Sequence, residues 1–201
     1  MSGPWLIVGL GNPGPAYAAT RHNIGATLIA HLASDAGVKL SRHKRALAET
    51  AETHFGFPGD REPIVLCAPL SYMNESGGPV KAAMAFYDVT PDRLVVVHDE
   101  LDIDFGAIRI KKGGGDGGHN GLKSIRRALG TGDYFRVRLG IGRPPGRQAP
   151  ADFVLQPFSS SERSELPVFL DRAASAVETV VRRGLEVAQN EFNRPISGDD
   201  A

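Results

Sequence analysis

His22 stands in a short polar segment, Arg21-His22-Asn23, directly before a stretch with helical periodicity. A neutral imidazole can take up a proton near neutral pH, so His22 is a candidate general base. A second polar segment, His98-Asp99-Glu100-Leu101-Asp102, ends the most apolar strand-like run of the chain. A carboxylate there can accept from an imidazole N–H and stabilise its charged form. A solvated loop histidine and a surface turn are the alternatives.

The sequence offers no convincing nucleophile to accompany this histidine. It lacks a Gly-x-Ser-x-Gly elbow, and its single cysteine, Cys67, lies in an apolar run that favours a small core residue. Water is therefore the expected nucleophile. Asp99, Glu100, Asp102 and Asp104 have oxygen ligands, but their spacing lacks the central glycine of a calcium loop. We expect neither a metal nor a cofactor.

The first glycine loop, Gly9 to Gly14, follows an apolar strand-like run and formally matches the dinucleotide-binding fingerprint. Such a site uses backbone N–H groups at a helix N-terminus, and Pro13 and Pro15 have none. The helical periodicity also begins only near Asn23. We therefore interpret the loop as a turn, or as a loop that presents Asn12, whose amide can both donate and accept hydrogen bonds.

Two further loops follow strand-like runs. Residues 69–78 contain Met73 and Asn74, for which a core residue and a helix cap are the alternatives. Residues 113–118 include five glycines in six positions. Because this composition is entropically costly, it favours close approach of a bulky ligand, or a mobile segment, over a plain connection. The helix that begins near His119 offers amides to a phosphate.

Charge is unevenly distributed in a chain whose formal net charge is zero. Residues 106–150 carry ten basic and two acidic side chains, a net charge of +8, so the remainder carries −8. A phosphate backbone responds to such a local surface. A solvated basic surface without a partner is the alternative. The ten basic residues are Arg109, Lys111, Lys112, Lys123, Arg126, Arg127, Arg136, Arg138, Arg143 and Arg147.

These loops join alternating strands and helices, and the length of 201 residues suits one domain. The alternation predicts a single α/β domain, with a mixed, largely parallel sheet flanked by helices. The final helix is predicted over 167–189, with Ser164 or an earlier serine near its cap. The strand at 134–141 is predicted to be half-buried, with Arg136 and Arg138 on a basic outer face. Strands are expected at 5–10, 45–53, 64–68, 93–98, 107–111 and 134–141, and the other helices at 23–36, 79–87 and 119–129.

The ends of the chain and its cysteine content favour a cytoplasmic protein. The N-terminus lacks a basic region before its apolar stretch, and no apolar run approaches about 20 residues. A lone cysteine cannot form an internal disulfide. Residues 1–193 are expected to form the domain and 194–201 a polar C-terminal tail, frayed from Ile196.

The motifs together resemble the bacterial-type peptidyl-tRNA hydrolase family, over residues 5 to about 190. Single motifs are weak signals, whereas their order and spacing are specific. They are Gly9-Leu10-Gly11-Asn12-Pro13-Gly14, Tyr17, Arg21-His22-Asn23-Ile24-Gly25, the run from Pro69 to Gly77, His98-Asp99-Glu100-Leu101-Asp102, Gly117-Gly118-His119-Asn120-Gly121-Leu122, and the run from Arg136 to Pro144.

The resemblance implies a monomeric, metal-free enzyme that acts in ribosome rescue. It would hydrolyse the ester between peptide and tRNA in prematurely released peptidyl-tRNA, binding the acceptor end and the attached peptide. No membrane and no obligate protein partner are implied. Asp116, inside the glycine loop, departs from the usual pattern and adds a negative charge beside the phosphate path.

The resemblance also assigns roles to individual residues. His22 is implied as the catalytic base and Asp99 as its orienting partner. Asn12 and Asn120 would position the water or the substrate carbonyl. The substrate-binding residues implied are Tyr17, Met73, Asn74 and Asn120, and the tRNA-phosphate contacts are Arg109, Lys111 and Arg138.

Two other functions fit parts of the sequence. A non-catalytic RNA-binding relative would keep the basic surface, but the intact His22, Asp99, Asn12 and Asn120 argue against it. A nucleotide-dependent enzyme built on the first glycine loop is disfavoured by its prolines.

Overall fold

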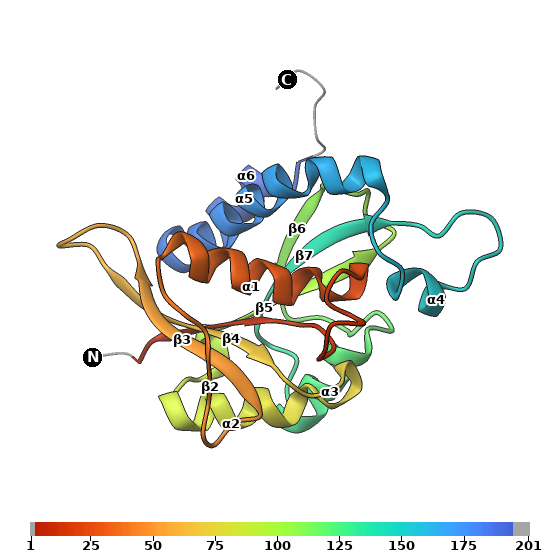
Figure 1. Ribbon diagram of the computed structural model, residues 1–201. Helices are drawn as coiled ribbons and strands as arrows, with labels where there is room; N and C mark the ends of the chain where they lie inside the picture. The colour runs from red at the N-terminus through yellow and green to blue at the C-terminus, as the bar shows by residue number, and fades with distance from the viewer. Residues whose placement is uncertain (1–2, 195–201) are drawn as a thin grey trace.

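The computed structural model describes residues 3–194, which fold around one seven-stranded sheet (Figure 1). The strand order is β2-β3-β4-β1-β5-β7-β6. The central pairs β4–β1, β1–β5 and β5–β7 are parallel, whereas the outer pairs are antiparallel. The strands are β1 (Trp5–Gly9), β2 (Ser41–Arg42), β3 (Ala48–Phe55), β4 (Glu62–Pro69), β5 (Leu94–Leu101), β6 (Ile108–Lys112) and β7 (Phe135–Gly142).

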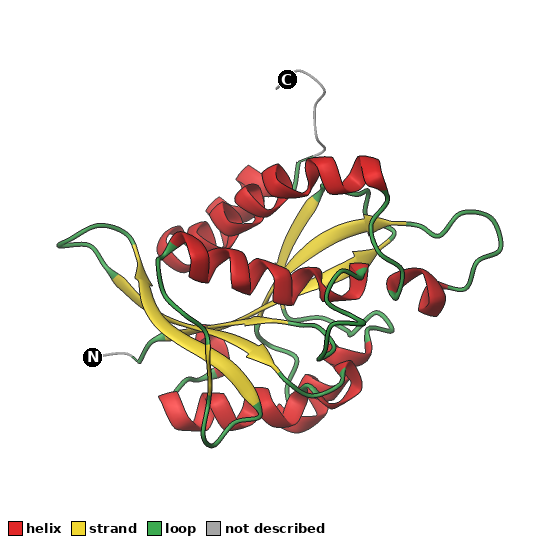
Figure 2. Cartoon of the chain, in the orientation of Figure 1, coloured by secondary structure: helices red, strands yellow, loops and turns green. Residues whose placement is uncertain are grey.

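Helices cover both faces of the sheet, as Figure 2 shows. On one face, α1, α5 and α6 pack over a core that includes Ile7, Val95 and Val137; on the other, α2 and α3 cover Val8 and Val96. The predicted α/β fold with a mixed, centrally parallel sheet is confirmed. The helices are α1 (Ile24–Asp35), α2 (Gly77–Tyr87), α3 (Asn120–Leu129), α4 (Pro150–Val154), α5 (Ser160–Arg183) and α6 (Leu185–Phe192).

The parallel centre explains where the polar motifs meet. Residues Leu94 to Val97 of β5 are fully buried on both faces, so the apolar run is continuous rather than alternating. Side chains that follow this run emerge at the carboxyl ends of the parallel strands, where open α/β sheets form their sites. Gly9 of β1 and Asp99 of β5 reach the same end of the sheet.

The C-terminal helix differs from its prediction. It begins at Ser160, because Ser159 and Glu162 form a reciprocal capping box. The predicted start at residue 167 is therefore wrong, whereas the prediction of a cap at a serine before Ser164 is confirmed. Pro167 lies inside α5 rather than before it. The helix also divides into α5 and α6 at Gly184, which has a φ of +86°.

Strand β7 corrects a second expectation. Arg138 is partly exposed, but Arg136 is fully buried, so the predicted basic outer face is wrong for Arg136. Its guanidinium donates to the carbonyl oxygens of Gly114 (2.8 Å), Gly115 and Gly132 (3.1 Å). The glycine loop therefore folds over Arg136 and is fixed to it.

Three smaller expectations concern the rest of the chain. Cys67 is a core residue, and burial raises the pKa of its thiol to about 12. Within residues 3–194, no helix has the length and apolarity needed to cross a membrane. The predicted tail falls outside the described residues except for Arg194.

Candidate active site

Asp99 is the centre of a buried polar cluster at the end of β5. Its carboxylate is only 2% exposed and lies between two imidazoles. His22 Nδ1 lies 2.9 Å and 3.0 Å from the two oxygens, and His119 Nε2 lies 2.8 Å from Oδ1. His22 comes from the 3-10 helix η1 (Arg21–Asn23), and His119 caps α3. Three separate segments therefore converge on one carboxylate.

The cluster keeps Asp99 ionised. Burial alone would raise the pKa of this carboxyl, but the charges and hydrogen bonds of His119 and His22 outweigh burial and hold the pKa well below its usual value. An ionised carboxylate only accepts hydrogen bonds. Both imidazole nitrogens that face Asp99 therefore carry hydrogen.

The start of α3 fixes the tautomer of His119 independently. Its Nδ1 accepts from the backbone N–H groups of Gly121 (3.1 Å) and Leu122 (3.4 Å), so the hydrogen is on Nε2. His22 has no comparable second bond: within residues 3–194, Nε2 of His22 has no hydrogen-bond partner. With its hydrogen on Nδ1, His22 leaves Nε2 as a free acceptor.

His98 supports the cluster from beneath. Burial, followed by the charge of His119, lowers the pKa of His98 well below its usual value, so the ring is neutral. Its Nδ1 donates to the backbone oxygen of Asp99 at 2.7 Å, and its ring lies edge-on to His119 at 4.9 Å. Its buried Nε2 has no partner among the described residues.

Asn12 is held in a fixed orientation by Asn23, the residue that follows His22. Its backbone N–H donates to Asn23 Oδ1, and Asn23 Nδ2 donates back to the Asn12 carbonyl, both at 2.9 Å. Its side-chain Oδ1 accepts from the Met73 N–H at 2.7 Å, so the Nδ2 hydrogens remain to be donated elsewhere. A Cβ at Gly9 would lie 2.1 Å from the Gly25 oxygen. Gly9 thus permits β1 to pack against α1, which is a structural role, not a nucleotide-binding one.

A cavity of about 400 Å³ opens beside His22. His22, Asp99, His119 and Asn120 form its polar side. Its other lining residues are Glu100, Leu101, Gly117, Gly118, Ala149, Pro150, Ala151 and Val154, the last four from α4 and its N-cap. The predicted base His22, its predicted partner Asp99 and one predicted substrate residue, Asn120, therefore line the same cavity.

The remaining predicted substrate residues lie outside the lining of this cavity. Met73 is buried, and its sulfur lies close to Gly121, where a Cβ would be only 2.7 Å away. Asn74 is exposed on the 3-10 helix η2 (Met73–Glu75). Tyr17 packs edge-on against Tyr72, with 6.3 Å between ring centroids. Of these three residues, Met73 contacts Asn12, whose side chain accepts from the Met73 amide.

The basic residues of β6 and β7 form like-charge pairs. Arg109 lies directly opposite Arg138, and Lys111 lies opposite Arg136. Such cross-strand pairs are destabilising unless an anion is near. Burial, then the charges of Arg138 and Arg136, lowers the pKa of Lys111. Glu100 forms an ion pair with Arg138 at 3.0 Å, and its charge opposes the lowering of the Lys111 pKa without outweighing it. We call Arg109, Lys111 and Arg138 the β6–β7 basic surface.

Comparison with known proteins agrees with this arrangement. A family model described as peptidyl-tRNA hydrolase matches residues 6–199. The chain belongs to the peptidyl-tRNA hydrolase family. A peptidyl-tRNA hydrolase of Frankia casuarinae is 59% identical over 191 residues, covering 95% of this chain and 94% of the relative. One of Streptomyces coelicolor is 56% identical over 191 residues, covering 94% and 95%.

A solved structure shows the same fold. The crystal structure of peptidyl-tRNA hydrolase from Acinetobacter baumannii is 37% identical, covers 96% of both chains and gives a TM-score of 0.84. The predicted family and its hydrolase activity on peptidyl-tRNA are therefore confirmed.

Two groups among the described residues bring histidine and carboxylate ligand atoms within 4.8 Å of one another. The first is His22, Asp99 and His119, whose inward nitrogens carry hydrogen and donate to Asp99. A metal there would have to displace both hydrogen bonds. The second is the half-exposed ion-pair group of His31 with Asp35 and Asp171, on α1 and α5.

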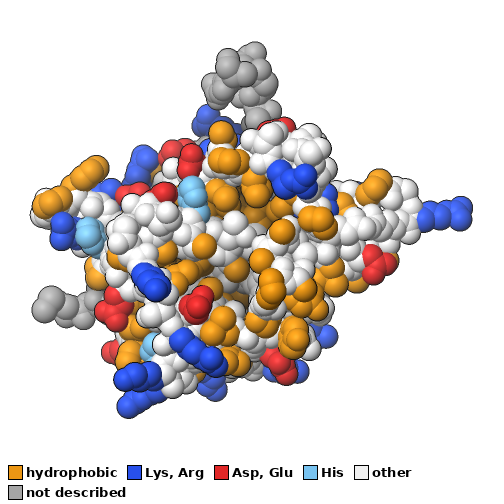
Figure 3. Space-filling model, in the orientation of Figure 1, with side chains coloured by type: hydrophobic (Ala, Val, Ile, Leu, Met, Phe, Trp, Pro, Cys, Tyr) orange, Lys and Arg blue, Asp and Glu red, His pale blue; other side chains and the backbone are white. Residues whose placement is uncertain are grey.

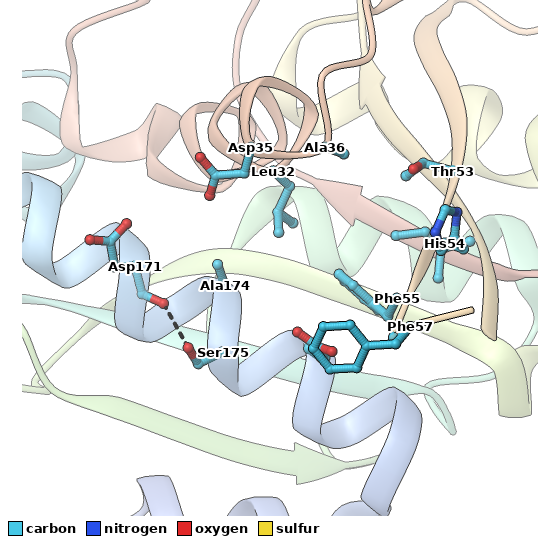
Figure 4. Close-up of a pocket in the computed structure, with 13 residues that line it drawn as sticks. Leu32, Asp35, Ala36, Thr53, His54, Phe55, Phe57, Asp171, Ala174 and Ser175 are labelled. Atoms are coloured by element: carbon cyan, nitrogen blue, oxygen red, sulfur yellow. Dashed lines mark hydrogen bonds between the residues drawn. The ribbon is translucent and has the colours of Figure 1, made fainter. Parts of the chain in front are cut away.

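A larger cavity, of about 470 Å³, lies beside this second group (Figure 4). Leu32 of α1, Phe55 and Phe57 of the β3–β4 hairpin and Ala174 of α5 line it, with Asp171 at its rim. It contains none of the predicted site residues. Size alone would therefore not have selected the cavity beside His22, which the motif residues identify.

Sequence reasoning left open whether His119 has a role beyond structure, and it placed Arg136 on a basic outer face. His119 directly precedes α3, and a histidine at the N-cap can hold the helix through one nitrogen while donating from the other. The carbonyl groups of Gly114 and Gly115, which bury Arg136, lie far from it in sequence and reach it only in the folded sheet. The first signal was present in the sequence, and the second depended on the sheet.

Proposed function

We propose that His22, oriented by Asp99, is the general base in hydrolysis of peptidyl-tRNA by this chain. The observation that carries this proposal is the free Nε2 of His22 beside the cavity, since Asp99 occupies its other nitrogen. No other nitrogen of the cluster combines a free lone pair with access to the cavity, because His119 Nδ1 accepts from α3 and His98 is buried.

The proposed reaction uses water as the nucleophile. Nε2 of His22 takes a proton from water while its oxygen attacks the carbonyl carbon that joins the peptide to the ribose oxygen. The imidazolium is stabilised by Asp99 and then returns the proton to the departing ribose oxygen. The products are a peptide with a free carboxyl group and a tRNA with a free hydroxyl. No step uses a metal or a cofactor.

The oxygen that becomes negative in the intermediate needs hydrogen-bond donors. Asn12 Nδ2 is free to donate, because its Oδ1 is occupied by the Met73 amide. Asn120 lies in the cavity wall at the start of α3. We propose these two amides as the donors; loss of one such donor reduces kcat by about 10² to 10³.

The peptide with the acceptor end, and the rest of the tRNA, would then extend from the cavity in different directions. We propose that Tyr17, Met73 and Asn74 contact the peptide and the acceptor end, and that the β6–β7 basic surface holds tRNA phosphates. The unbalanced charge of that surface supports the second assignment. We further propose that the chain acts in the cytoplasm as a monomer.

The test is hydrolysis of an N-blocked aminoacyl-tRNA, with a chelator present, by wild type, His22→Ala and His54→Ala. His54 is an exposed histidine on β3, away from the cluster, and serves as the matched control. We expect His22→Ala to lose about 10² to 10⁴ in kcat while binding uncharged tRNA normally. The control should retain full activity. Normal turnover by His22→Ala would overturn the mechanism.

A further inference from the structure

A second basic region lies at the opposite edge of the sheet, around the two-residue strand β2. Residues 36–48 carry four basic side chains and no acidic one. Because residues 106–150 carry +8 and the whole chain is neutral, the residues outside both segments carry −12. The positive charge of residues 36–48 is therefore local, because the residues outside the two basic segments are acidic on balance. Its members are Lys39, Arg42, Lys44 and Arg45.

These side chains surround a groove of about 540 Å³. All four are exposed, and Glu52 is the only acidic residue of the described chain that lines the groove. Figure 3 shows Lys and Arg side chains along the lower left of this face, near β2 and the turn that follows it. A polyanion would find a concave surface with a net positive charge.

Aromatic rings form one side of the same groove. Phe86, at the end of α2, is 49% exposed, although it is a large apolar residue. The ring of His43 packs edge-on against Phe86 at 4.4 Å and lies 5.7 Å from Tyr87. The guanidinium of Arg45 lies 5.7 Å over the Phe86 ring. An exposed ring beside basic side chains is the combination that single-stranded nucleic acids recognise.

The turn that presents the charges is rigid. Nδ1 of His43 accepts from the backbone N–H groups of Arg45 at 3.1 Å and Ala46 at 2.9 Å. The His43 N–H itself donates to the Ala48 oxygen at 2.9 Å. A fixed turn loses little conformational entropy when a ligand binds.

We propose that Lys39, Arg42, Lys44, Arg45 and Phe86 form a second RNA-binding surface, which contacts phosphates and one unpaired base. In the strand order, β2 is five strand spacings from β7 and six from β6, which is roughly 24 to 29 Å along the sheet from the β6–β7 basic surface. One phosphate group therefore cannot serve both. The shared ligand chemistry is an RNA backbone, whether a distant part of the substrate tRNA or a ribosomal RNA segment.

Protection of an exposed sheet edge is another reason for charges near β2. It explains Arg42, which lies in β2. It does not explain Lys44 and Arg45, which follow the strand, or the exposed Phe86 ring on a helix. An RNA-binding surface explains why Lys44, Arg45 and Phe86 are exposed together.

The experiment measures binding rather than catalysis, so it does not depend on the role of His22. The test variant is Arg42→Gln/Lys44→Gln/Arg45→Gln, and the matched control is Arg61→Gln/Arg163→Gln/Arg183→Gln. Both variants change the net charge from 0 to −3, and the control removes exposed residues away from this groove. Fluorescence anisotropy would measure the affinity of each variant for uncharged tRNA and for purified ribosomes at several salt concentrations, with thermal unfolding as a check on folding.

We expect the test variant to bind RNA about tenfold more weakly, with a salt dependence reduced by about two to three charges, whereas the control binds normally. Phe86→Leu should weaken binding about fivefold without changing the salt dependence. A loss for tRNA identifies the substrate as the RNA, and a loss for ribosomes alone that recurs with protein-free ribosomal RNA identifies ribosomal RNA. Unchanged affinity for both, or equal losses in test and control, would overturn the proposal.

Discussion

The cluster around Asp99 and the β6–β7 basic surface lie on neighbouring strands but satisfy their charges in opposite ways. In the cluster, a buried carboxylate accepts from two imidazoles, and one of these is itself fixed by backbone amides. On the basic surface, Arg109 faces Arg138 across the ladder, and Glu100 is the only carboxylate of the described chain paired with this surface.

The two regions therefore differ in whether they need the substrate to balance their charges. The cluster contains its own hydrogen-bond donors to Asp99, so its geometry is complete in the free protein. The basic surface is complete only when an anion reaches it. We therefore expect substitutions in the cluster to act mainly on kcat and substitutions on the surface to act mainly on binding.

The largest effect is expected for Asp99→Asn, which is nearly isosteric. An asparagine at position 99 accepts with one atom and donates with the other. Because α3 fixes His119 as a donor, the tautomer of His22 must change, and its Nε2 then carries hydrogen. We expect kcat to fall by about 10³ to 10⁴, as happens when an orienting carboxylate is lost elsewhere. Steady-state kinetics with an N-blocked aminoacyl-tRNA measures this.

The same variant also tests the depressed pKa of Asp99. A carboxyl whose pKa is lower in the folded state contributes stability above its unfolded pKa, near 3.8, and loses it as the pH falls through the folded value. The difference in unfolding free energy between wild type and Asp99→Asn should thus be constant above about pH 5 and shrink below it. Urea unfolding of both proteins at pH 7 and pH 3 measures this difference, and an equal difference at the two pH values would contradict the prediction.

The next effect concerns the basic surface. Lys111→Gln/Arg138→Gln removes two of its charges and should weaken tRNA binding about 30-fold at low salt, with kcat nearly unchanged. The slope of log affinity against log salt should fall by about two. Binding of wild type that varied little with salt would remove tRNA phosphates from this surface.

A smaller loss is expected for His119→Asn, which separates the two roles of His119. Asparagine is a good N-cap, so α3 should keep its start. Its shorter side chain should not reach Asp99, and the lost bond to a charged group corresponds to about a tenfold lower kcat. His119→Leu, which also lacks the cap, is the control: it should lose stability as well as activity. Equal unfolding temperatures for the two variants would contradict the capping role.

The sequence predicted the elements whose burial pattern is unambiguous. The run at residues 94–97 could only be a central strand, and the polar residues after it therefore lie at the edge where sites form. The spacing of Asn12, His22 and Asp99 along the chain, however, gave no distances. The distances between these side chains depend on the close packing of β1 against α1, which Gly9 allows.

What escaped prediction depends on partners far apart in sequence. Arg136 alternates correctly for an outward position, but the glycine loop and Gly132 supply enough carbonyl groups to bury it. The two-residue strand β2 has no periodicity of its own, and α4 is a single turn and a half that packs through Phe153 and Val154. Such short elements are stabilised by packing against the larger sheet and helices, not by their own sequence.

The smallest predicted effect concerns Asp116, the negative charge inside the glycine loop. Its carboxylate lies 4.0 Å from Arg126, whose side chain is 55% exposed, so this ion pair stabilises the fold little. The loop is held instead by Arg136. Asp116→Asn should therefore leave kcat and unfolding unchanged and strengthen tRNA binding about twofold at low salt, because a charge that repels phosphates is gone. Glu165→Gln, an exposed change of the same charge on α5, is the control. Weaker binding in Asp116→Asn alone would mean that the Arg126 pair orders the loop for tRNA.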